Sequence, residues 1–71
     1  MHPLLALTLR EAPLSPGKVR VVVDVSRRTT HRDFDTLAQA RAYADDVRRE
    51  GEDPGATLVL LFDPNGERLG D

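Results

Sequence analysis

Residues 34–51 read FDTLAQARAYADDVRREG, and this stretch carries the clearest structural signal in the chain. Thr36 is followed three residues later by Gln39, a capping box in which each side chain can satisfy a free amide at a helix start. Asp35 is a competing N-cap, and Gly51 is a suitable residue just beyond the helix end. The stretch therefore predicts one helix over about 36–50. Its core-facing residues recur at spacings of three and four: Leu37, Ala40, Tyr43, Ala44 and Val47.

Two stretches outside this helix alternate as half-buried strands do. Residues 18–26 place valines at every second position, and β-branched side chains suit a pleated surface. Residues 57–63 alternate in the same way, with Leu58, Leu60 and Phe62 on one face. The sequence Asp63-Pro64-Asn65-Gly66 favours a tight turn, after which residues 67–69 can return as a short edge strand.

The first part of the chain is less distinctive. Leucines alternate through residues 4–10, which predicts a first strand, although the run also suits a short helix. Residues 27–33 are polar and either continue the strand 18–26 or form the bridge into the helix.

Together these elements predict an α+β fold. We expect the order β-β-α-β-β, with an antiparallel four-stranded sheet and one helix packed on one face. The expected strand order across the sheet is 18–26, 4–10, 57–63 and 67–69.

Length and composition limit the classes of function that the chain can have. The 71 residues predict a single domain, 1–71, whose small core favours stabilisation by oligomerisation. The chain has no cysteine and only two histidines, so we expect no metal and no cofactor. Ten basic and twelve acidic residues leave a net charge of −2, which does not favour nucleic acid as the main partner. No apolar run is long enough to span a membrane, and we expect a cytoplasmic protein.

One helix can cover only one face of the predicted sheet. Apolar residues expected on the other face would form a patch of the kind that marks interfaces. We therefore expect a self-associating or protein-binding module, most simply a homodimer through this open sheet face. The interface residues of this hypothesis are Leu4, Ala6, Val22, Val59 and Leu61.

Residues 27–32 form a basic loop. Arg27, Arg28 and Arg32 are candidate anion-binding residues, and weak nucleic-acid binding through this loop is the alternative function. The adjacent Asp45 and Asp46 point about 100° apart on a helix and cannot act as a carboxylate pair. Since no nucleophile with a base is recognisable, we expect no enzyme activity and no catalytic residue.

The chain resembles small bacterial domains of unknown function that share a hairpin–helix–hairpin plan. The resemblance covers about residues 18–70. It rests on Phe34-Asp35-Thr36 at the helix start, on the final strand leading into Asn65-Gly66, and on the helix alanines Ala38, Ala40 and Ala44. It implies the ββαββ fold and no catalytic residue.

Overall fold

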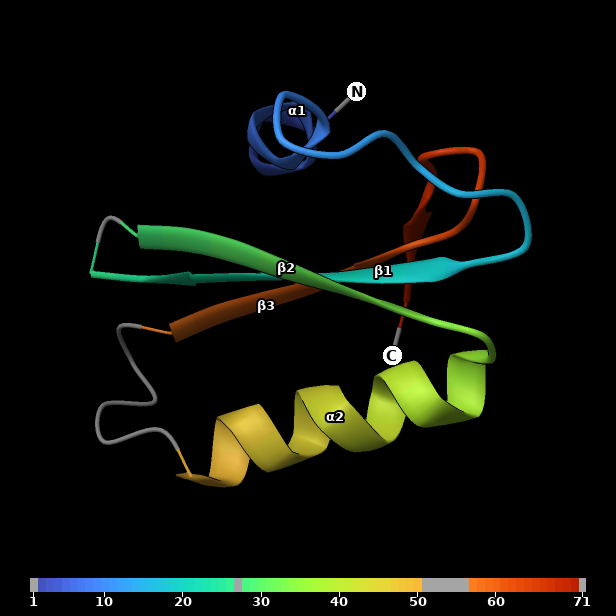
Figure 1. The fold of residues 1–71 in the computed structure, drawn as a ribbon. Helices are drawn as coiled ribbons and strands as arrows, with labels where there is room; N and C mark the ends of the chain where they lie inside the picture. The colour runs from blue at the N-terminus through green and yellow to red at the C-terminus, as the bar shows by residue number, and fades with distance from the viewer. Residues whose placement is uncertain (1, 27, 51–56, 71) are drawn as a thin grey trace.

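Two helices enclose a four-stranded antiparallel sheet in the computed structural model of the chain (Figure 1). The structure describes residues 2–26, 28–50 and 57–70. The α+β class, the antiparallel four-stranded sheet and the order β-β-α-β-β are confirmed, with a further helix preceding them. The elements are α1 (Pro3–Leu9), β1 (Val19–Val25), β2 (Arg28–Phe34), α2 (Leu37–Glu50), β3 (Thr57–Phe62) and β4 (Arg68–Leu69).

The strands lie in the order β2-β1-β3-β4, so the expected strand order is wrong. β1 occupies the interior and pairs antiparallel with β2 on one side and with β3 on the other. Val22, at the middle of β1, lies opposite His31 and opposite Leu60. The place expected for residues 4–10, beside β3, is therefore filled by β1 itself.

Helix α1 covers Pro3–Leu9, so the predicted strand over residues 4–10 is wrong. The His2 side chain caps α1, its Nδ1 accepting from the amide of Leu4 at 3.1 Å, and Pro3 occupies the first turn, where no amide is needed. Leucine also ranks high in helix propensity and only moderately in strands. Leu5 and Thr8, three residues apart, are buried against the sheet, which is a helical spacing.

Residues 28–34 form a separate strand, β2, so neither interpretation of the polar stretch 27–33 is correct. A turn containing Ser26, whose φ is +50°, lies between β1 and β2. Residues of β2 alternate between exposed and half-buried, as expected for a charged edge strand. Hydrogen bonding to β1 along seven residue pairs, rather than an apolar pattern, holds this strand in the sheet.

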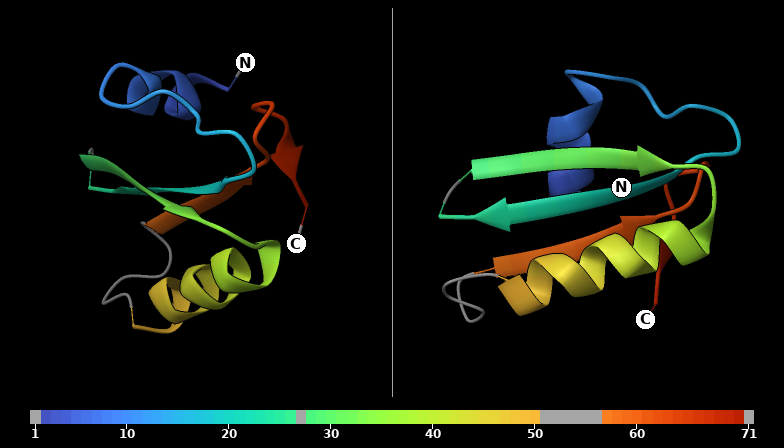
Figure 2. Two further views of the ribbon diagram at one scale, coloured as in Figure 1. Left: turned by 45° about the vertical axis from the view of Figure 1, so that its right-hand side comes forward. Right: turned by 60° about the horizontal axis from the view of Figure 1, so that its bottom comes forward.

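α2 forms where the sequence predicts a helix, and the Thr36 hydroxyl accepts from the amide of Gln39 at 3.1 Å. α2 runs along one face of the sheet, while α1 lies across the strands on the other face (Figure 2). The expectation of a single helix on one face is thus incomplete, because α1 supplies a second cover.

Each face of the sheet carries its own apolar core. Odd-numbered valines of β1 face α2 and the even-numbered Val22 faces α1, as strand alternation requires. The α1-side core consists of Leu5, Val22, Leu60 and Phe62. The α2-side core consists of Val19, Val21, Val23, Ala40, Ala44, Val59 and Leu61.

Candidate functional site

The five residues predicted as a sheet-face interface do not form one surface. Val22 is fully buried in the α1-side core, whereas Val59 and Leu61 are buried in the α2-side core. Leu4 is half-buried and Ala6 is exposed, and both belong to α1. The premise of an uncovered apolar face is therefore wrong, because α1 covers it.

Arg20 is the most buried charged side chain among the described residues, with no exposed surface. It lies on the α1 side of β1, on the same face as Val22. Its Nε and Nη2 donate to the two carboxylate oxygens of Asp33 at 2.8 and 3.0 Å. Nη1 donates to the Thr8 hydroxyl at 3.1 Å and to the Ala12 carbonyl at 2.8 Å, and Nη2 also donates to the Pro13 carbonyl at 3.1 Å.

These five bonds use all the donors of a guanidinium group. They join the end of α1 and the chain after it to β1 and β2, so the network attaches the α1 layer to the sheet. The sequence contained a signal for it that the pattern analysis missed. Arg20 is the only charged residue within the apolar run from Val19 to Val23.

The charge of Arg20 also acts on Asp33. The hydrogen bond from the Arg20 side chain holds the pKa of Asp33 below its usual range, although burial of the carboxyl opposes this shift. The positive charges of Arg20, His31 and Lys18 lower the pKa of this carboxyl further. Asp33 is thus held as a carboxylate, and the network acts as a structural ion pair.

The predicted anion-binding residues are only partly brought together. Arg27 lies outside the described residues. Arg28 and Arg32 lie on the α2 side of β2, four residues and thus about 13 Å apart along the strand. The guanidinium of Arg32 lies 5.3 Å from the ring centroids of both Phe34 and Tyr43, which is cation–π distance. Arg32 therefore packs on the aromatic pair at the edge of the α2-side core.

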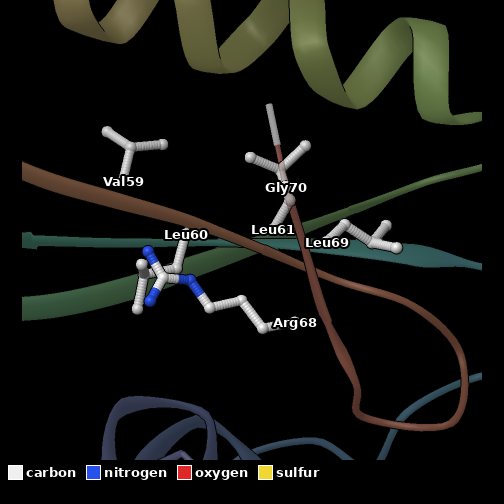
Figure 3. Close-up of a pocket in the computed structure, with 6 residues that line it drawn as sticks. All are labelled: Val59, Leu60, Leu61, Arg68, Leu69 and Gly70. Atoms are coloured by element: carbon white, nitrogen blue, oxygen red, sulfur yellow. The ribbon is translucent and has the colours of Figure 1, made fainter.

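The outer edge of β3 is the surface with the most binding potential. β4 pairs only with Leu61 and Phe62, so residues 58–60 of β3 have no strand partner on that side within the described parts of the chain. We call the outer edge of residues 58–60 the β3 edge. A hollow of about 290 Å³ adjoins it (Figure 3), lined by Val59, Leu60, Leu61, Arg68, Leu69 and Gly70.

Two local interactions accompany the path of the chain around β4. The Asp63 carboxylate accepts from the amides of Asn65 and Glu67, both at 2.9 Å, which shapes the turn before β4. The Gly70 carbonyl then accepts from Nη2 of Arg41 at 3.4 Å, so the chain runs towards α2. In Figure 3 the segment Arg68–Gly70 runs steeply across the direction of β3.

Two side chains at the β3 edge add to its binding potential. Leu58 is 45% exposed, although the alternation of β3 places it on the α1 side with the buried Leu60. Arg68 lies opposite Phe62, hence also on the α1 side, and is exposed. It has no acidic partner within salt-bridge distance among the described residues, and its side chain extends towards Leu60 in Figure 3.

The arrangement provides backbone hydrogen-bonding groups, an apolar side chain and a cation, but no recognisable reactive group. Among the described residues, no cluster of three or more histidine, aspartate or glutamate side chains is placed to hold a metal ion. No helix in the described ranges is long and apolar enough to cross a membrane. Searches of protein-family models, curated proteins and solved structures find no match to this chain.

Proposed function

We propose that this chain is a non-catalytic protein-binding module that accepts an extended segment as an additional strand at the β3 edge. The observation that carries the proposal is that β4 covers only the last two residues of β3. An edge strand with unpaired amides and carbonyls is a template for another strand. Main-chain hydrogen bonds then supply affinity, and alternate side chains supply specificity.

The side chains around the β3 edge support this proposal. An added strand would cover Leu58, one of the few large apolar side chains exposed in the described residues. It would also close the hollow beside Val59 and Leu69. Each new backbone hydrogen bond contributes about 1 kcal/mol net, so a contact of three or four residues predicts weak, reversible binding.

The opposite edge of the sheet is less suited to strand addition. β2 presents exposed Arg28, Thr30 and Arg32 side chains, and charged side chains on an edge strand discourage pairing. Its side facing α1 is also polar, with Asp33 engaged by Arg20. The β3 edge, by contrast, has leucine and valine at the three unpaired positions.

Titration with a neutral strand-forming peptide tests the proposal. The probe is the capped peptide acetyl-Thr-Val-Thr-Gln-Thr-Val-Thr-amide, and the readout is the amide NMR spectrum of the labelled protein. We expect saturable shift changes centred on residues 58–60 and 68–70. The variant Leu58→Lys, which places a charge on an exposed edge position, should abolish them while retaining the native spectrum elsewhere.

A spectrum unchanged at millimolar peptide, or changes confined to β2, would refute strand addition at the β3 edge. Residues 28–32 belong to strand β2 and not to a loop. The alternative function, weak nucleic-acid binding through the basic residues of 27–32, remains a prediction, and the same assay tests it. A short single-stranded oligonucleotide at low salt should then shift the amides of Arg28 and Arg32, and added salt should reverse the effect.

A further inference from the structure

Resting on this proposed function, we infer that the segment accepted by the β3 edge is an acidic one from another protein, not a second copy of this chain. The inference begins with Arg68. This side chain is exposed, lines the hollow beside the β3 edge and has no carboxylate within 4 Å among the described residues. Lys18 and Arg49 lie beside aspartates, and Arg28, which has no such partner among the described residues either, lies on β2 at the opposite edge of the sheet.

The register of the sheet determines which side chains an added strand must carry opposite Leu58 and Leu60. Leu58, Leu60 and Arg68 share the α1 side of the sheet. A residue paired with Leu60 would therefore lie on that side, next to the guanidinium of Arg68, and an acidic side chain there would form an ion pair. A residue two positions away would lie over the exposed Leu58 and is expected to be apolar.

A second copy offers no such match at either of its sheet edges. Antiparallel pairing of two β3 edges would bring two Arg68 side chains to the contact and no carboxylate from the paired segments, which contain only leucine and valine. Pairing of the β3 edge with β2 of another copy would add Arg28 and Arg32 to the same contact. The carboxylate of β2, Asp33, is already bound by Arg20. In both cases the cation at the β3 edge stays unmatched, whereas an acidic segment neutralises it.

The experiment compares the peptide used above with acetyl-Thr-Val-Thr-Glu-Thr-Val-Thr-amide, which differs by one carboxylate. An apolar residue stands two positions from the acid on each side, so the probe serves either strand direction. We expect the acidic peptide to bind about three- to fivefold more tightly at low salt, and Arg68→Gln to remove this advantage. Added salt should reduce it as well.

Two controls separate a local ion pair from general charge attraction. The protein carries a net charge of −2, so non-specific electrostatics would favour the neutral peptide. Arg49→Gln changes the net charge by the same amount as Arg68→Gln at a site on α2, and it should keep the preference for the acidic peptide.

The outcomes are distinguishable. Equal affinity for both peptides at residues 58–60 would overturn this inference while supporting strand addition. Absence of binding by either peptide would overturn both. A concentration-dependent dimer in light scattering that Leu58→Lys dissociates would identify a second copy as the occupant and would also overturn this inference.

Discussion

Replacing Asp33 by alanine tests the structural role of the buried guanidinium directly. In the native structure Asp33 receives two hydrogen bonds from Arg20, at 2.8 and 3.0 Å, and supplies its counter-ion. The Arg20 side chain has no exposed surface, so the variant leaves two charged donors buried without their partner. An uncompensated buried charge costs more than the intact pair contributes, because desolvation is no longer offset.

The size of the effect follows from the exposure of the two partners. Removal of one member of a fully buried ion pair costs about 3–5 kcal/mol. The Asp33 side chain is 26% exposed, so water can reach part of the vacated space, and we reduce the expectation to about 2–3 kcal/mol. A domain of 71 residues has a total stability of about 4–10 kcal/mol, so the variant should lose a large part of it.

Urea unfolding followed by circular dichroism measures this loss, and the midpoint of thermal unfolding should fall by about 10–20 °C. Asp46→Ala is the matched control, because it removes an exposed carboxylate paired with Arg49 on α2 and should change stability by less than about 0.5 kcal/mol. If Asp33→Ala costs no more than this control, the account of the buried network is wrong.

A double-mutant cycle and a pH series extend the same test. Arg20→Met combined with Asp33→Ala should cost about 1.5–2.5 kcal/mol less than the sum of the single variants, since the second change removes the unpaired charge. The pKa of Asp33 is lower in the folded state, so its contribution is present above the unfolded value, near 4, and is lost as the pH falls through the folded value. The stability of Asp33→Ala should therefore depend less on pH in this acidic range than that of the native chain.

Three further substitutions test other elements of the fold, each by urea unfolding. Leu5→Ala should cost about 3 kcal/mol, because the side chain of Leu5 is fully buried between α1 and the sheet, whereas the matched change at the exposed Leu7 should cost less than about 1 kcal/mol; equal costs would contradict the packing of α1 on the sheet. Thr36→Ala should cost about 1 kcal/mol through loss of the bond to the Gln39 amide, and a neutral result would show that another residue caps α2. Gly66→Ala should cost about 1–2 kcal/mol because Gly66 has a φ of +86°, which strains any residue with a Cβ atom, so a stabilising effect would argue against this turn conformation.

Local signals were sufficient for β1 and for the chain from Thr36 onward. The capping residue Thr36 and the apolar spacing of residues 37–47 located α2, and alternating valines and leucines located β1 and β3. The turn at Asp63–Gly66 and the returning strand after it were also correctly predicted. Each of these elements has a periodic pattern or turn chemistry that only one type of local structure satisfies well.

The segments that form α1 and β2 lacked such signals. Seven residues of α1 contain leucines at both strand and helix spacings, and periodicity over so short a segment does not separate the two. β2 has no apolar alternation. Its Asp33 side chain accepts hydrogen bonds from Arg20, and several of its other side chains are exposed at the edge of the sheet. The premise of the expected dimer interface, an uncovered apolar face of the sheet, was wrong for the same reason. Because residues 4–10 were predicted as a strand, no element was expected to cover that face.

The sequence by itself determined the α+β class, the amphipathic helix, three of the strands, the final turn and the absence of disulfides, because these depend on neighbouring residues or on composition. The tertiary structure decided that residues 4–9 are helical, that a polar segment joins the sheet, and that Arg20 is buried with five hydrogen bonds. It also decided which strand edge lacks a partner among the described residues, because β4 pairs only with Leu61 and Phe62. These outcomes depend on contacts between residues far apart in the chain, whose free energies no local pattern records.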